Sequence, residues 1–262
     1  MKLTQIRNAT LKITYGGTRF LIDPMLSEQH SWPGFAGTAR AHLRNPLVGL
    51  PLPLAEILDV DVVIITHTHE DHWDAQAQAL LAKDQCIYTQ HAQDAALLQQ
   101  QGFTRVQILG ASTVINGITV HKTAGQHGSD AAYAIPAVAA RLGEACGVVM
   151  QHPDEPTLYL AGDTVWVPAC RQVLAQWQPG VVVLNAGDAR VDEIGPIIMG
   201  KEDLLRVHQT CPGAAIVASH MEAINHCLLS RAELREYTRA QGISAKVWIP
   251  ADGETLDFGT GH

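Results

Sequence analysis

Cysteine is scarce in this chain, and the few cysteines present do not form the pattern of a disulfide framework. Five occur among 262 residues, far apart and odd in number, and no two of them make a C-x-x-C pair. This spacing argues against a secreted disulfide scaffold and against a C-x-x-C redox or zinc motif. We expect reduced thiols in a cytoplasmic protein, most of them small core residues.

Long hydrophobic runs are also missing. The longest apolar run, residues 131–140, is interrupted by Pro136 and is far too short to cross a bilayer. Residues 1–7 lack the apolar core of a signal peptide. We therefore expect no membrane association.

Positive charge is in deficit. The chain has 18 Lys and Arg against 26 Asp and Glu, a net charge of −8. This balance argues against broad binding to nucleic acid or to an anionic membrane. The expected partner is a small-molecule substrate. That substrate could be anionic if the protein has a local basic pocket. Formation of a homo-oligomer is left open. With 47% hydrophobic residues, we expect a single globular domain over residues 1–262.

Strand-like and helix-like segments alternate along the chain in two similar halves. Asp74 is placed to cap a helix over residues 75–82, and residues 26–56 form a long irregular stretch of the kind that serves as a lid or binding loop. Two sheets covered by outer helices would satisfy this order. Strands are expected at 11–15, 19–22, 86–90, 105–109, 113–115, 118–124, 133–141, 146–151, 157–161, 181–184, 214–219 and 246–249, and helices at 91–101, 167–177, 201–210 and 230–241.

The most informative stretch follows the apolar run 62–65 directly. It places His67, His69, Asp71 and His72 in the pattern H-x-H-x-D-H. In an extended segment, residues two apart project to the same side, so His67 and His69 can hold one ion. Asp71 and His72 fall where the chain turns and point to a neighbouring position, while Glu70 is expected to face away. Imidazole and carboxylate suit zinc, and also manganese or iron. The alternative is a solvated histidine-rich loop.

Three further candidate ligands follow apolar strands later in the chain. They are His127, Asp163 and His220, and the segment 185–188 has the same form. A histidine after a strand is by itself more often a hydrogen-bonded loop residue than a ligand. The order of these residues behind the H-x-H-x-D-H motif favours a metal site.

In this order of motifs the chain resembles the metallo-β-lactamase superfamily, over nearly its whole length. The resemblance implies a four-layer αββα sandwich of the α/β (α+β) class, with the site at one edge between two sheets. It implies two divalent ions, zinc or manganese with iron possible. The first would be held by His67, His69 and His127, the second by Asp71, His72 and His220, and Asp163 would bridge them. The presence of Asp163 argues against antibiotic hydrolysis.

Within the superfamily, the chain looks most like the ascorbate-6-phosphate lactonase-like group, whose members also resemble the N-acyl-phosphatidylethanolamine phospholipase D enzymes. The motifs that suggest this are Leu21–Pro24, His72–Asp74 and Met199–Gly200. The predicted activity is metal-dependent hydrolysis of a small ester, lactone or sugar-phosphate lactone by a metal-activated water. The alternatives are a phosphodiesterase acting on a nucleotide or phospholipid, and a non-catalytic metal-binding protein of the same fold.

Roles outside the ligand set are assigned to residues near these motifs. Asp71 is predicted to orient the nucleophile as well as bind metal, and His226 is a candidate general acid or substrate donor, with a surface or capping role as the alternative. Arg40, Arg44 and His42, with His30, would form an anion pocket over the metals, because arginine matches phosphate oxygens; a solvated loop is the alternative. Residues expected to orient the ligand rings are Asp23, Asp188 and Ser219.

Overall fold

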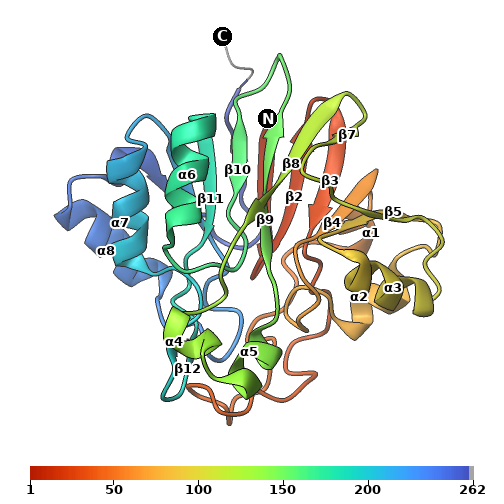
Figure 1. Ribbon diagram of the computed structural model, residues 1–262, viewed down its shortest axis with the longest axis horizontal. Coiled ribbons are helices and arrows are strands. Elements are labelled where there is room, and N and C mark those ends of the chain that lie inside the picture. The colour runs from red at the N-terminus through yellow and green to blue at the C-terminus, as the bar shows by residue number, and fades with distance from the viewer. Residues whose placement is uncertain (260–262) are drawn as a thin grey trace.

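Two sheets packed face to face form the centre of the fold (Figure 1). The computed structural model describes residues 1–259. Within those residues the first seven-stranded sheet contains, in spatial order, β16 (Thr255–Asp257), β1 (Lys2–Arg7), β2 (Thr10–Tyr15), β3 (Thr18–Ile22), β4 (Val62–Ile65), β5 (Cys86–Thr89) and β6 (Val106–Ile108). The second contains β15 (Val247–Trp248), β14 (Ala215–Ser219), β11 (Val181–Asn185), β10 (Leu158–Leu160), β9 (Cys146–Gln151), β8 (Ile118–Ala124) and β7 (Thr113–Ile115).

Helices cover the outer face of each sheet. On the first sheet lie α1 (Leu54–Ile57), α2 (Ala75–Leu80) and α3 (Ala92–Gln100), and on the second lie α6 (Pro168–Trp177), α7 (Lys201–Thr210) and α8 (Arg231–Ala240), with a short 3-10 turn, η1 (Ser244–Lys246), after α8. The predicted four-layer αββα sandwich is therefore confirmed.

The sequence of β4 shows how these layers arise. Val62 and Ile64 join the core between the two sheets, whereas Val63 and Ile65 pack against the outer helices. Side chains alternate between the faces of a strand, and a strand covered on both faces is apolar throughout. The continuous apolar run before the H-x-H-x-D-H motif thus marks a strand at the centre of the sandwich.

Helix starts follow the local signals in the sequence. The Asp74 carboxylate accepts a hydrogen bond from the Ala77 backbone N–H at 2.7 Å, so Asp74 caps α2 as predicted. Ser230 caps α8 in the same way, through the N–H of Glu233. Pro168 occupies the first turn of α6, where its missing N–H leaves no hydrogen bond unmade.

The predicted strand over residues 133–141 is wrong. The structure has two short helices there, α4 (Asp130–Tyr133) and α5 (Pro136–Leu142). Alanine is the strongest helix former, the segment is rich in it, and Pro136 stands at the first position of α5. The strands β1 and β16 and a hairpin of β12 (Arg190–Val191) with β13 (Gly195–Pro196) were not predicted.

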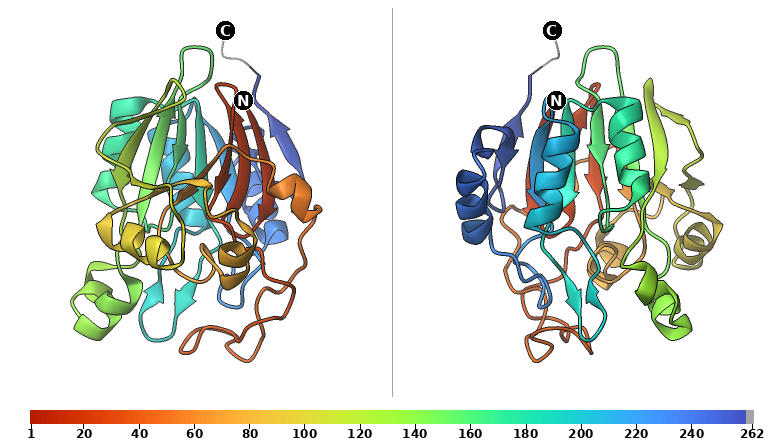
Figure 2. Two further views of the ribbon diagram at one scale, coloured as in Figure 1. Left: turned by 90° about the vertical axis from the view of Figure 1, so that its right-hand side faces the viewer. Right: turned by 60° about the vertical axis from the view of Figure 1, so that its left-hand side comes forward.

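The parallel strands bring their carboxyl ends to one edge of the sandwich. β3, β4 and β5 run parallel, as do β10, β11 and β14; β8 runs with β10 because both are antiparallel to β9. The chain segments beyond that edge include α4, α5, the β12–β13 hairpin and the irregular stretch between β3 and α1 (Figure 2). Among residues 1–259, no helix is both long and apolar enough to cross a membrane.

Candidate metal centre

The seven predicted ligands come from strand ends that meet at this edge. His67, His69, Asp71 and His72 follow β4, whereas the other three follow β8, β10 and β14 in the second sheet. All seven except the half-buried His69 are buried. The sandwich therefore assembles one cluster from residues up to 153 positions apart, His67 to His220.

Two of these strand ends need unusual backbone conformations. His220 has a φ of 58°, in the left-handed region that a side chain other than glycine rarely adopts. Gly162, just before Asp163, has a φ of 68°, and a Cβ there would lie 2.3 Å from the Cys146 carbonyl oxygen. Only glycine fits this turn, which directs Asp163 into the cluster.

The ligand atoms form three overlapping groups, each lying within 4.8 Å. The groups are His67, His69 and His127; His67, His72 and Asp163; and Asp71, His72 and His220. The first and third match the two half-sites that the family resemblance implies, and the second joins them. Imidazole nitrogens and carboxylate oxygens in this arrangement fit divalent metal of the zinc or manganese type.

Asp163 occupies the middle of the cluster through one oxygen. Its Oδ2 lies 3.8 Å from Nε2 of His67 and 3.1 Å from Nε2 of His72. The same oxygen lies 3.6 Å from Nε2 of His127 and 3.7 Å from Nε2 of His220. A single carboxylate oxygen thus faces imidazoles of both half-sites.

The second nitrogen of each ring has its own partner, which fixes the ring and its tautomer. His127 Nδ1 lies 2.8 Å from the Ile197 carbonyl oxygen. His69 uses Nε2 instead, 3.0 Å from the carbonyl oxygen of Arg141, which leaves Nδ1 facing His67. Each ring therefore presents one defined nitrogen to the cluster.

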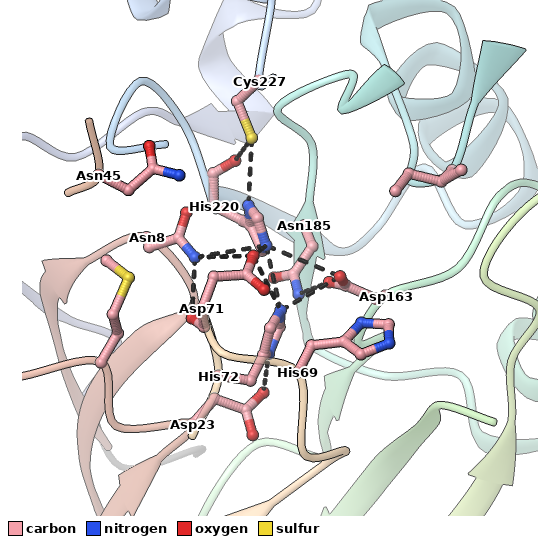
Figure 3. A network of polar contacts seen from close by, with 12 residues as sticks. Asn8, Asp23, Asn45, His69, Asp71, His72, Asp163, Asn185, His220 and Cys227 are labelled. Atoms are coloured by element: carbon pink, nitrogen blue, oxygen red, sulfur yellow. Dashed lines mark hydrogen bonds and ion pairs between the residues drawn. The ribbon is translucent and has the colours of Figure 1, made fainter. Parts of the chain in front are cut away.

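Asp23, one of the three residues predicted to orient ligands, contacts the motif directly (Figure 3). Its Oδ2 lies 2.8 Å from His72 Nδ1 and accepts a hydrogen bond from the Thr66 hydroxyl at 2.6 Å. The Thr66 oxygen in turn lies 3.1 Å from Nδ1 of His67. One buried carboxylate thus orients one ring directly and a second through Thr66.

His220 is held by a thiol and by a turn of the first sheet. Its Nδ1 lies 3.3 Å from Cys227 Sγ, and its backbone N–H donates to the Asn8 carbonyl at 2.9 Å. The Asn8 amide donates to the Asp71 carbonyl oxygen at 3.1 Å. Asn8, between β1 and β2, therefore links the motif after β4 to the end of β14 (Figure 3).

The buried charges call for a compensating cation. Burial would lower the pKa of His72, but the carboxylates of Asp163 and Asp23 outweigh burial and raise it to about 10. Burial opposes ionisation of Asp163, yet His72 and His220 hold its pKa well below the usual range. By contrast, burial lowers the pKa of His127 to about 4, which suits a neutral metal ligand. The cluster thus combines ionised carboxylates with imidazoles that can bind a divalent cation.

A cavity of about 160 Å³ opens beside the cluster. Apolar groups of its wall come from Phe35, Leu142, Val191 and Ile197. The other lining residues are Thr38, His69, Glu70, Asp71, His127, Arg141, Asp163 and His226. Glu70, expected to face away from the metals, belongs to none of the three ligand groups but does line this cavity.

His226 reaches the cavity from the segment after His220. It is buried, its ring packs edge-on against Phe35 at 4.9 Å, and among the described residues its Nδ1 has no hydrogen-bond partner. Burial lowers its pKa to about 4, so the ring is neutral at pH 7. A neutral imidazole can donate a hydrogen bond to substrate, but it is not a charged general acid.

The predicted anion pocket is not formed, which corrects the expectation for Arg40, Arg44 and His42. The Arg40 guanidinium donates to the backbone carbonyls of Asn225 and Cys227. Arg44 donates to the carbonyls of His30 and Ser31, and His42 is exposed. None of the three lines the cavity, because the two guanidiniums satisfy backbone carbonyls of the loop and of the segment after His220 instead.

Two of the three predicted orienting residues do not touch a ligand side chain. Asp188 accepts hydrogen bonds from Arg190 Nε, and the Ser219 hydroxyl donates to Gln5 and to the Asn8 carbonyl. The residues that do hold the ligands include Thr66, Cys227 and Asn185, which sequence reasoning did not single out for this role. Thr66 and Asn185 carried a signal, since each stands at the end of an apolar strand, whereas Cys227 did not.

Comparisons with known proteins agree with this geometry. The family model described as "Beta-lactamase superfamily domain" matches residues 18–221. The chain is 43% identical to the UPF0173 protein YddR of Bacillus subtilis (strain 168), over 98% of this chain and all of that protein. Among solved structures, it is 56% identical to an isothiocyanate hydrolase from Delia radicum gut bacteria, with a TM-score of 0.97 and coverage of 99% and 100%. It is 41% identical to a possible metal-dependent hydrolase from Veillonella parvula DSM 2008, with a TM-score of 0.96 and coverage of 98% for both chains.

Proposed function

This chain belongs to the metallo-β-lactamase superfamily and is a metal-dependent hydrolase, and we propose that its substrates are small uncharged electrophiles of the isothiocyanate class. The observation that carries this proposal is the cavity beside the cluster. It is small and has an apolar wall, and Arg141 is the one arginine or lysine that lines it within the described residues. The similarity to an isothiocyanate hydrolase supports the same substrate class.

The metal ligands are part of the proposal. One divalent ion would be held by His67, His69 and His127, and a second by Asp71, His72 and His220, with Asp163 shared. When bound, the ions supply an activated water at neutral pH and polarise the atom that accepts negative charge.

The side chains around the cavity would do the remaining work. Asp71 lines both the cluster and the cavity, so its carboxylate would orient the attacking water. His226, neutral at pH 7, would donate a hydrogen bond to the substrate atom on which charge develops. Phe35 and Leu142 would exclude bulk water and contact the organic part of the substrate.

A small lactone, including a sugar-phosphate lactone of the lactonase-like group, is the second candidate. The observation that favours it is Arg141, whose guanidinium lies at the cavity and would meet an anionic group there. One guanidinium nitrogen, Nη2, donates to the Ala36 carbonyl at 2.7 Å, so binding an anion would compete with this contact. A phosphodiester, with charge at the reacting centre itself, fits the apolar wall less well.

The test is a direct assay of the metal-loaded protein with three substrate classes. Hydrolysis of an isothiocyanate consumes one water and releases the amine and carbonyl sulfide, both of which can be quantified. We expect turnover of 2-phenylethyl and allyl isothiocyanate that is lost on chelation and restored by zinc or manganese. Parallel assays use a γ-lactone and bis-p-nitrophenyl phosphate.

The relative kcat/KM values decide between the candidates. Lactone turnover with no amine released from either isothiocyanate would overturn the first proposal in favour of the second. Turnover of none of the three classes by protein shown to contain metal would favour a non-catalytic role.

A further inference from the structure

We propose that Asn185 is a positioning residue that makes Asp163 bridge the two half-sites through a single oxygen. The proposal rests on the metal centre assigned under the proposed function and goes beyond it, because it concerns how the shared carboxylate is held. The two oxygens of Asp163 have different partners, and Asn185 accounts for the difference.

Asn185 occupies one oxygen of the carboxylate. Its side-chain amide Nδ2 donates to Asp163 Oδ1 at 2.6 Å, a short contact of the charge-assisted kind (Figure 3). Both side chains are buried, with exposed fractions of 7% for Asn185 and 3% for Asp163. The second oxygen, Oδ2, is the one that faces the imidazoles, nearest to His72 at 3.1 Å.

The topology places this amide where it is needed. β10 and β11 are parallel neighbours, paired so that Leu160 lies opposite Val183. Asn185 is the last residue of β11, and Asp163 follows the end of β10 after the tight turn at Gly162. The amide and the carboxylate therefore meet at adjacent strand ends.

A buried carboxylate without this donor would be free to turn. Rotation about χ2 would present both oxygens to the cluster, one toward each half-site, or leave Oδ1 without a hydrogen bond. With Asn185 in place, Oδ1 is already in use and Oδ2 alone is available to both half-sites. Because Asp163 is shared, losing Asn185 should weaken both half-sites rather than one.

The experiment measures metal binding in Asn185→Ala and Asn185→Asp. The second variant keeps the size of the side chain but replaces the donor with an acceptor. Metal-free protein is titrated with zinc against a chromophoric chelator, and the visible spectrum of the cobalt-substituted protein is recorded. We expect two equivalents in the wild type and a fall of about 10- to 100-fold in affinity for both equivalents in each variant, with altered cobalt bands. We also expect kcat to fall while KM stays within about twofold, since Asn185 does not line the cavity.

Asn45→Ala is the matched control. Asn45 is also buried, with an exposed fraction of 0%, but its amide donates a hydrogen bond to the Asn225 side chain and not to the cluster. It should lower stability and leave zinc affinity and the cobalt spectrum unchanged.

The outcomes separate this proposal from the one before it. Wild-type affinity and spectrum in Asn185→Ala, or in Asn185→Asp should the alanine variant not fold, would overturn the role of Asn185. A loss of affinity for only one of the two zinc equivalents would also overturn the role of Asn185. A wild-type protein that binds no metal would instead overturn the metal centre itself.

Discussion

The cluster of proposed metal ligands and the wall of the cavity beside it are built in different ways. The cluster comes from strand ends of both sheets, and each imidazole has its second nitrogen engaged. The apolar wall comes from the irregular stretch, α5 and the segment around β12–β13. Loops vary more readily than the sheets that carry them. The sandwich therefore supplies the proposed metal ligands, whereas three peripheral segments supply the apolar wall that, in our proposal, contacts the substrate.

The wall is nonetheless held firmly by polar contacts of its own. The Asn225 side chain accepts a hydrogen bond from the Phe35 backbone N–H at 3.1 Å and donates to the Thr38 hydroxyl at 2.8 Å. Arg141 Nη2 donates to the Ala36 carbonyl, which ties α5 to the same loop. The wall is therefore a defined surface, and changes in its side chains should alter selectivity before they alter the cluster.

The largest effect should come from His69→Ala, because His69 belongs to both regions. Its Nδ1 faces His67 at 3.1 Å, and its Nε2 contacts the Arg141 carbonyl at 3.0 Å. We expect loss of bound metal and a fall in kcat of about 10²- to 10³-fold, the scale of lost electrostatic stabilisation. Elemental analysis and steady-state kinetics measure the two effects.

The control for this variant is His121→Ala. His121 stacks on Trp177 at 4.2 Å, away from the cluster, so metal content and kcat should stay at wild-type values. Wild-type activity in His69→Ala would refute the assignment of the first half-site.

The second prediction concerns His226. This residue lines the cavity, and like most of the cluster it is buried. Burial lowers its pKa in the folded protein to about 4, below the ordinary histidine pKa of 6.5, so the unfolded state binds a proton first as pH falls. Stability should therefore be complete above pH 6.5 and be lost as pH falls toward 4. Between pH 7.5 and pH 5.0 this group alone should lower the free energy of unfolding by about 2 kcal/mol.

The measurement compares wild type with His226→Gln. Urea unfolding of both metal-free proteins at the two pH values isolates the contribution of His226, because the titrations of the ligand histidines are common to both. Equal pH dependence in the two proteins would mean that the ring is not buried in a neutral form.

The cluster and the cavity wall also differ in how well the sequence predicted them. The four layers, and the meeting of the seven proposed ligands at one edge, were predictable because each of these residues follows an apolar strand, and parallel strands end at one edge. The wall was not, because its residues are ordinary apolar side chains whose role depends on how loops fold back. Nothing in the sequence distinguishes Phe35 or Ile197 from core residues.

Two further errors have definite physical causes. Residues 133–141 were assigned to a strand from their apolar content, although the alanines and Pro136 favour the helix that forms. The charge of Arg40 and Arg44 predicted an anion pocket, but irregular segments need donors for their backbone carbonyls, and the two guanidiniums serve the loop and the segment after His220. Charge pattern alone does not reveal which way a loop arginine turns.

The third prediction tests the wall directly with Phe35→Ala. The ring packs against His226 at 4.9 Å and Trp32 at 5.3 Å, so removing it enlarges the cavity and removes an apolar contact. We expect KM for 2-phenylethyl isothiocyanate to rise about tenfold, within the 1–3 kcal/mol scale of pocket contacts. Metal content should not change, and preference should shift toward bulkier substrates.

Phe258→Ala is the control for this change, since Phe258 packs against Trp248, away from the cavity wall. Its KM should match that of the wild type. Loss of metal in Phe35→Ala would contradict the separation of wall and cluster.

The smallest effect is expected for the double variant Arg40→Ala with Arg44→Ala. Both guanidiniums donate to backbone carbonyls of the loop and its neighbours, and neither lines the cavity. Their loss should lower the melting temperature, while kcat/KM changes by less than about twofold for neutral and anionic substrates alike.

Arg141→Ala is the comparison, because the Arg141 guanidinium lies at the cavity and its loss should raise KM for an anionic lactone specifically. A rise in KM for anionic substrates in the double variant, with no change for neutral ones, would show that the long loop closes over the site during turnover. The arginines would then belong to the wall after all, and the substrate class would move toward phosphorylated compounds.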